Sequence, residues 1–155
     1  MLLLLKNLLF TLILPGTIGV YVPLLLAGDR IAASGPVFLI ALVLLATGGG
    51  IYAWCVWDFA TFGRGTPAPI DAPKKLVVRG LYRYVRNPMY VGVLTVIGGW
   101  ATMFLSTTLL IYAVCVGTGF HLFVVLYEER RLARQFGGEY SDYCAKVPRW
   151  LPRFR

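Results

Sequence analysis

Long apolar segments separated by short polar connections fill most of the chain up to residue 126. Residues 2–26 and residues 36–59 each reach the length of roughly 20 apolar residues that a helix needs to cross a bilayer. Residues 89–126 are apolar throughout but too long for one crossing, and a break near residues 104–107 divides them into two tightly connected helices. The pattern therefore predicts an all-α membrane helical bundle of about four spans, in which the last two spans form a helical hairpin.

Polar residues gather in two long segments, the connection 62–86 and the tail 127–155. A connection of this length is often functional. The tail is predicted to begin as a helix, to stop at Gly137 and Gly138, to resume over residues 139–146 and to end at Pro148. We therefore expect the tail to form a helical extension outside the apolar bundle.

The composition supports a membrane protein, because 58% of the residues are hydrophobic and 14% are charged. Soluble domains have roughly 45–50% apolar and about 25% charged residues. The net charge of +8 comes mostly from the two polar segments, so the positive-inside rule places both segments and both termini on the cytoplasmic face. We expect a multi-pass protein of the cytoplasmic (inner) membrane with no nucleic-acid partner, because these charges flank apolar segments. The three cysteines have no short spacing and predict no metal site.

The hairpin should bring the two polar segments together on one face of the membrane. Asn87 and Pro88 stand at its entry, and Glu128 stands at its exit. With neighbouring tyrosines, arginines and backbone N–H groups, they predict a pocket that opens to the cytoplasm on one side and to lipid on the other. Such a pocket suits a water-soluble cofactor that acts on a membrane-embedded substrate. Asp58, at the end of the second span, is either an interfacial residue or a further part of this pocket.

Two gapped motifs lie on either side of the hairpin. The first reads Gly80-Leu81-Tyr82 and Arg86-Asn87-Pro88-Met89-Tyr90-Val91-Gly92, and the second reads Glu128-Glu129, Leu132, Phe136-Gly137, Tyr140, Tyr143 and Val147-Pro148. Over roughly residues 74–152, this pattern resembles the isoprenylcysteine carboxyl methyltransferase and phospholipid methyltransferase superfamily of integral membrane enzymes. The resemblance implies a single domain over 1–155, with two N-terminal spans in 1–62 and a cofactor-binding catalytic core in 63–155.

The resemblance also implies S-adenosyl-L-methionine as the methyl donor and assigns residues to it. The implied cofactor contacts are Lys74, Lys75, Leu76, Val77, Tyr82, Asn87, Pro88, Met89, Tyr90 and Glu128. Glu128 suits the cationic sulfonium and ammonium groups of this donor. Asn87 stands where the family has a histidine, and because an amide does not titrate near neutral pH, it favours binding over proton transfer. Asn87, Glu128 and His121 are the candidate catalytic residues.

The methyl acceptor is less well defined than the donor. The isoprenylcysteine enzymes carry an arginine for the substrate carboxylate at the position of Val124, so this chain lacks that clamp. His121 lies seven residues before Glu128, on the same face of an α-helix, and suits a neutral nucleophile that needs a base. The expected function is an isoprenylcysteine methyltransferase-like enzyme whose lipophilic or prenylated substrate enters from the bilayer lipids. A phospholipid amine N-methyltransferase and a lipophilic thiol methyltransferase are the enzymatic alternatives, and a small transporter or scaffold is the non-enzymatic one.

Overall fold

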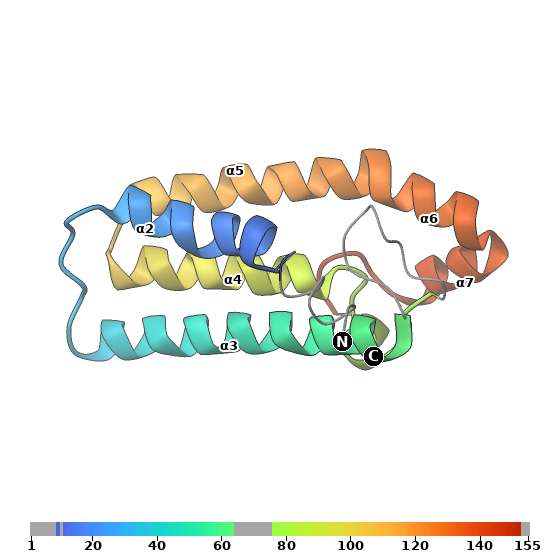
Figure 1. The fold of residues 1–155 in the computed structure, drawn as a ribbon, viewed down its shortest axis with the longest axis horizontal. Coiled ribbons are helices and arrows are strands. Elements are labelled where there is room, and N and C mark those ends of the chain that lie inside the picture. The colour runs from blue at the N-terminus through green and yellow to red at the C-terminus, as the bar shows by residue number, and fades with distance from the viewer. Residues whose placement is uncertain (1–8, 10, 64–75, 153–155) are drawn as a thin grey trace.

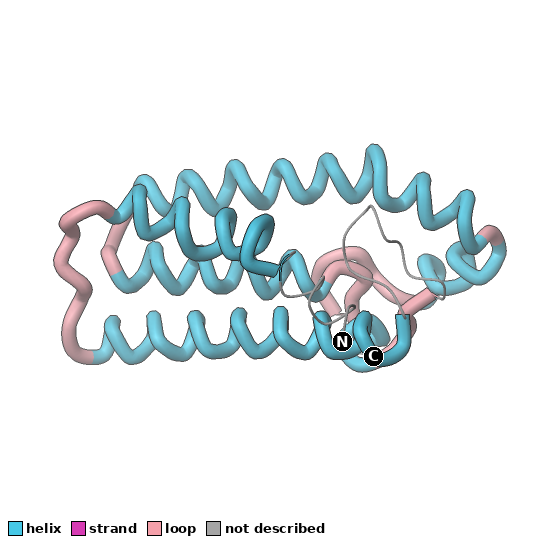
Figure 2. The backbone as a smooth tube through the Cα atoms, viewed as in Figure 1, coloured by secondary structure: helices cyan, strands magenta, loops and turns pink. Residues whose placement is uncertain are grey.

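The computed structural model describes residue 9, residues 11–63 and residues 76–152 of the chain. All regular secondary structure in this part is helical (Figure 2). The predicted all-α class is therefore confirmed. The predicted cofactor contacts Lys74 and Lys75 lie outside the described residues.

The first helix, Thr11–Ala27, contains the π-helical turn η1 (Thr17–Tyr21) and ends with α2 (Val22–Ala27). In a π turn, N–H groups reach back five residues, which leaves a carbonyl without its usual helical partner. Pro23, which has no N–H, likewise leaves the Gly19 carbonyl without its helical donor. Side chains of the neighbouring helices donate to carbonyls of this turn. Trp100 donates its indole N–H to the Gly19 carbonyl oxygen at 3.1 Å, and Tyr112 donates its hydroxyl to that of Ile18 at 2.9 Å. The irregular turn therefore attaches the first helix to the rest of the bundle.

The second helix, α3 (Pro36–Asp58), continues into the π-helical turn η2 (Phe59–Gly63) and packs along α4 (Pro88–Met103). The two backbones touch where Gly48 faces Gly92. A Cβ added to Gly48 would lie 2.7 Å from the Gly92 carbonyl oxygen, and one added to Gly92 would lie 2.9 Å from the Gly48 carbonyl oxygen. Small residues allow this close approach of helices. α3 and α4 form the most closely packed helix pair of the bundle.

The last apolar helix is the longest element (Figure 1). α5 (Thr107–Phe123), the π-helical turn η4 (Val124–Glu128) and α6 (Glu129–Phe136) follow one another without interruption. Ser106 caps the start of α5 by accepting a hydrogen bond from the Leu109 N–H at 3.4 Å. Gly137, with φ of 52°, ends α6, and α7 (Gly138–Lys146) follows. The breaks predicted at 104–107 and at Gly137–Gly138 are therefore confirmed.

Two helical stretches of the described residues, Pro36–Phe62 and Thr107–Phe136, are long and apolar enough to cross a membrane. The other two apolar helices, Thr11–Ala27 and Pro88–Met103, are shorter. Large apolar side chains such as Val43 on α3 and Val114 on α5 are exposed, as expected for helices that face lipid. The fold thus has helices where the sequence places four spans, and the four-span topology stays a prediction.

Candidate active site

Residues 76–86 of the connection and the tail up to residue 152 meet at the end of the bundle where α3 ends and α4 begins (Figure 1). The 3-10 turn η3 (Gly80–Arg83) carries Tyr82, which is buried against Cys55 of α3. The Tyr143 hydroxyl of α7 donates to the Tyr82 carbonyl oxygen at 2.7 Å, and the Arg86 N–H donates to the Pro148 carbonyl oxygen at 2.9 Å. Burial raises the pKa values of Tyr82 and Tyr143, so both phenols stay neutral and can donate hydrogen bonds at physiological pH.

A hydrogen bond joins the two sequence motifs. Tyr90, in the first turn of α4, donates its hydroxyl to Oε2 of Glu128 at 2.9 Å. The Tyr90 ring also packs against Phe120 of α5, with ring centroids 4.6 Å apart. The structure therefore brings the start of α4 close to Glu128, a proximity that the sequence predicts.

Glu128 is the last residue of the π turn η4. This turn was not predicted from the sequence. The Glu129 N–H reaches the carbonyl oxygen of Val124, five residues back. The prediction that His121 and Glu128 share one face holds for an unbroken α-helix, whereas the wider π turn between them changes their relative direction. Such turns are frequent at functional sites. Residues 107–126 are apolar on all sides, so no break in a polar–apolar pattern marks this turn in the sequence.

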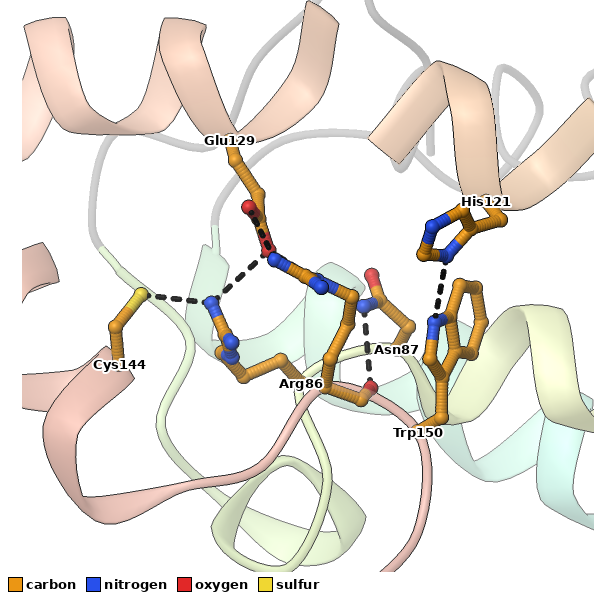
Figure 3. A network of polar contacts seen from close by, with 7 residues as sticks. Arg86, Asn87, His121, Glu129, Cys144 and Trp150 are labelled. Carbon is orange, nitrogen blue, oxygen red and sulfur yellow. Dashed lines mark hydrogen bonds and ion pairs between the residues drawn. The ribbon is translucent and has the colours of Figure 1, made fainter. Parts of the chain in front are cut away.

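Glu129 forms the densest polar network of the site (Figure 3). Arg149 donates Nε to Oε1 at 2.8 Å and Nη2 to Oε2 at 2.9 Å, and Arg86 donates Nη1 to Oε1 at 3.0 Å. The same Nη1 lies 2.8 Å from Sγ of Cys144. Two guanidinium groups thus compensate the charge of Glu129 and attach the tail to α6 and to the connection. Glu129 is not among the site residues predicted from the sequence.

Asn87 holds the tail backbone in place. Its side chain is 7% exposed, and its Nδ2 donates to the Arg149 carbonyl oxygen at 3.2 Å. It precedes Pro88, the first residue of α4, but makes no side-chain capping bond to that helix. The amide therefore connects the helix entry to the tail, a role that needs no titratable group.

His121 is paired with a tail residue that the sequence analysis did not select. Trp150 donates its indole N–H to Nδ1 of His121 at 3.2 Å (Figure 3). The Trp150 ring centroid lies 6.1 Å from that of His121 and 6.4 Å from that of Tyr90. Because Nδ1 accepts this bond, the neutral imidazole carries its hydrogen on Nε2. His121 can therefore act as a base through Nδ1 only after Trp150 moves away.

The remaining predicted contacts are packing residues. Val77 is buried with Tyr82 and Cys55, and Met89 packs against the same cluster. Leu76 packs against the cluster formed by Tyr140, Tyr143 and Val147. Their side chains therefore shape the walls around the Tyr82 turn and offer no polar group to a ligand.

Comparisons with known proteins place the chain in a family. Residues 37–139 match the family model described as phospholipid methyltransferase. Methanethiol S-methyltransferase 2 of Bradyrhizobium diazoefficiens is 37% identical over 73 residues, which are 47% of this chain and 27% of the relative. Methanethiol S-methyltransferases of Mycobacterium tuberculosis and Crocosphaera subtropica are 38% and 34% identical over 46% and 52% of this chain, respectively.

The matched stretches cover 27% to 30% of these three relatives, so they represent less than a third of each full-length protein. The family match covers more of this chain. It includes the whole first gapped motif and the part of the second motif up to residue 139. Since it spans residues 37–139, well over half of the sequence, the chain belongs to the phospholipid methyltransferase family.

Proposed function

We propose that this protein is an integral membrane methyltransferase that uses S-adenosylmethionine to methylate a lipophilic acceptor, with a thiol as the favoured nucleophile. Family membership supports the reaction class, and the names of the three relatives support the thiol. The observation that carries the proposal is the Tyr90–Glu128 hydrogen bond. It places a carboxylate and an aromatic wall together, where the apolar hairpin meets the polar tail.

The residues at this site fit the proposed donor. Glu128 is half-buried, its hydrogen-bond partner is a neutral phenol, and Arg131 attracts it electrostatically, so its negative charge is only partly compensated and can attract a ligand cation. The rings of Tyr90, Phe120 and Trp150 lie beside it and add the attraction of aromatic faces for cations. Nε of Arg86 is buried without a hydrogen-bond partner and is a suitable donor to the carboxylate of the ligand. When bound, S-adenosylmethionine supplies an activated methyl group on a positively charged sulfur.

The chain's own residues then position the acceptor and remove its proton. The acceptor sulfur lies beside Tyr90 and Trp150, which exclude water from the reacting atoms. The thiol proton passes to Nδ1 of His121 once the Trp150 hydrogen bond opens. With the donor bound, Tyr90 and Trp150 would hold the acceptor sulfur against its methyl group, and S-adenosylhomocysteine would be the leaving product. Most of the rate enhancement comes from this positioning.

A carboxylate acceptor is disfavoured at this site. Val124 occupies the position of the expected arginine clamp and is 1% exposed. Leaving a substrate carboxylate unpaired at the membrane edge costs several kcal/mol. A phospholipid amine is the second candidate acceptor, because the family that the chain matches is described as phospholipid methyltransferase.

The proposed topology follows from the charges. Four helices cross the cytoplasmic membrane, and the connection, the tail and both termini face the cytoplasm, because most lysines and arginines lie in these segments. The polar network that Arg86 and Arg149 form with Glu129 then lies on the cytoplasmic side, where the donor is dissolved. The acceptor enters from the lipid.

The test uses the purified protein in lipid nanodiscs with isotopically labelled S-adenosylmethionine. The acceptors offered are ethanethiol, octanethiol, a farnesylcysteine analogue and phosphatidylethanolamine, and products are identified by mass spectrometry. We expect labelled thioethers from both thiols and little product from farnesylcysteine. S-adenosylhomocysteine should bind in the micromolar range, about 8 kcal/mol, in calorimetry. No binding at millimolar ligand would reject the methyltransferase assignment, and methylated phospholipid without thioether would reject the thiol.

The role of His121 is tested in the same assay. His121→Ala should lower turnover of thiols by about 100-fold, the lower end of general base contributions, while the affinity for S-adenosylhomocysteine stays unchanged. Trp150→Phe removes the indole N–H but keeps an aromatic ring, so it should not lower turnover. An equal loss in the two variants would show that the His121–Trp150 pair acts only as a structural contact.

A further inference from the structure

Asp58 is a buried carboxylate that the proposed reaction does not yet use. It is the last residue of α3 and is 2% exposed. Its Oδ1 lies 3.9 Å from Nε of Arg79, and its Oδ2 is buried without any hydrogen-bond partner. A strong acceptor is therefore left unused in a region that excludes water.

The contact with Arg79 compensates this charge only weakly. A distance of 3.9 Å is too long for a hydrogen bond. The Arg79 side chain is 49% exposed, and its guanidinium carbon lies 3.7 Å from the centroid of the Phe62 ring. Exposed ion pairs contribute little, whereas a buried carboxylate without a partner is costly. Asp58 therefore has the properties of a group whose partner is a ligand.

Gly80 connects Asp58 to the site. A Cβ added to Gly80 would lie 2.2 Å from Oδ2 of Asp58, and the φ of 55° at this residue also favours glycine. Gly80 begins the η3 turn that carries Tyr82, one of the predicted cofactor contacts. Tyr82 packs on Cys55, which lies one helical turn before Asp58. Asp58 is thus in contact with the turn that the sequence motif assigns to the cofactor.

The charges at this end of the bundle indicate what the ligand of Asp58 is. Three carboxylates of the described residues at this end of the bundle are buried or half-buried: Asp58, Glu128 and Glu129. Glu129 is compensated by two arginines, Arg86 and Arg149. Asp58 has only the distant Arg79, and Glu128 has only the electrostatic attraction of Arg131, so these two are the less compensated carboxylates. S-adenosylmethionine carries two cationic groups, a sulfonium and an ammonium. The sulfonium has no N–H, which suits Glu128 among its aromatic rings, whereas the ammonium has three N–H donors for an unused acceptor oxygen.

We propose that Asp58 binds the ammonium group of the methyl donor, an inference that rests on the function proposed above. The η3 turn moves away from Asp58 to admit this group, because Gly80 lies against Oδ2 in the structure described here. The ligand chemistry is that of an α-amino acid linked to adenosine, and Asp58 selects for the amino group. The residue is a ligand-binding group and takes no part in moving the proton of the acceptor.

The experiment compares two ligands that differ only in the ammonium group. S-adenosylhomocysteine and its desamino analogue are titrated by calorimetry into the wild-type protein and into Asp58→Asn, both full-length in detergent. We expect the variant to bind S-adenosylhomocysteine at least tenfold more weakly, the minimum for a lost charged hydrogen bond. Its affinity for the desamino analogue should stay within twofold of the wild-type value. Asp142→Asn, at an exposed carboxylate of α7, is the matched control and should change neither affinity.

Thermal unfolding of the ligand-free variant separates ligand binding from a structural role. Asparagine has the shape of aspartate without its unpaired charge, so Asp58→Asn should unfold at the same temperature as the wild type or higher. A large fall in that temperature, or an equal loss of affinity for both ligands, would overturn the proposal. Unchanged affinity for S-adenosylhomocysteine in the variant would also overturn it while leaving the methyltransferase assignment intact. If the wild-type protein bound neither ligand, the methyltransferase assignment itself would fail.

Discussion

Glu128 and Glu129 are adjacent in the chain but have different partners. Glu128 accepts a hydrogen bond from Tyr90 across the hairpin, whereas Glu129 is held by Arg86 and Arg149. The second carboxylate uses its charge to attach the tail, whereas the first is the one proposed to bind the donor. The structural role and the proposed binding role therefore fall on adjacent residues.

Exchanging each carboxylate for an amide should show this separation. We predict that Glu128→Gln weakens S-adenosylhomocysteine binding by roughly 1.5–3 kcal/mol, the range for a hydrogen bond to a charged group. Glu129→Gln should instead lower the free energy of unfolding by about 1–3 kcal/mol, because it leaves two guanidinium groups without their anion. Calorimetry and thermal unfolding in detergent measure the two quantities. Equal losses of ligand affinity in both variants would contradict these assignments.

At the scale of secondary-structure elements, the contact between α3 and α4 depends on one glycine of a run of three. A Cβ at Gly48 would lie 2.7 Å from a backbone oxygen of α4, whereas Cβ atoms at Gly49 and Gly50 would meet nothing within 4 Å. α4 begins with the residues that contact Glu128 and the tail, so a shift of α4 against α3 would also move the site.

Alanine at neighbouring positions provides a matched test of this contact. Gly48→Ala should lower the free energy of unfolding by about 1–3 kcal/mol, the usual cost of overpacking. Gly49→Ala, on the same helix, should be neutral or slightly stabilising, because alanine favours the helix more than glycine does. The helical circular dichroism signal during thermal unfolding measures both effects. Equal destabilisation would show that the close approach does not limit α4.

Element boundaries were largely predictable from the sequence because they depend on local chemistry. Pro36 and Pro88 start helices, Ser106 caps one and Gly137 ends one. The π turns were not predictable, because the side chains that donate to their carbonyls come from residues distant in sequence. The Gly19 carbonyl, for example, receives the indole of Trp100, which is 81 positions further along the chain.

The candidate site was predictable only where a tight connection fixes its geometry. The hairpin implies that Tyr90 and Glu128 meet, since their helices share a short turn. The bond between Glu129 and Arg149 depends instead on how α7 folds back after Gly137, and no local pattern specifies that direction. The sequence allowed two interpretations of Asp58, an interfacial residue or a part of the pocket. It could not decide between them because the burial of Asp58 depends on Gly80, a residue of a different segment. The roles of the predicted site residues stay predictions until ligand binding is measured.

At the scale of the whole molecule, the orientation in the membrane is the main prediction. Single cysteines at Asp29 and at Ser141, both exposed, are placed in a chain whose three native cysteines are replaced. An impermeant thiol reagent should label position 29 from outside intact cells and position 141 only after permeabilisation, since positive charge retains the tail in the cytoplasm. Labelling of position 141 in intact cells would reverse the topology. A protein with the single cysteine at position 29 in detergent controls for reagent access.

The short length of α4 determines how deep in the membrane the proposed acceptor is bound. α4 has 16 residues, or about 24 Å at 1.5 Å per residue, against a hydrocarbon core of roughly 30 Å. If the turn after α4 lies at the outer boundary, Tyr90 stands below the inner headgroups, at a depth where acyl chains are the solvent. The concentration of the proposed thiol acceptor that the site encounters is then its concentration in the lipid. The aqueous thiol concentration that gives half-maximal rate should then be inversely proportional to the oil–water partition coefficient of the thiol. Partitioning into the membrane would therefore account for much of the selectivity for lipophilic acceptors.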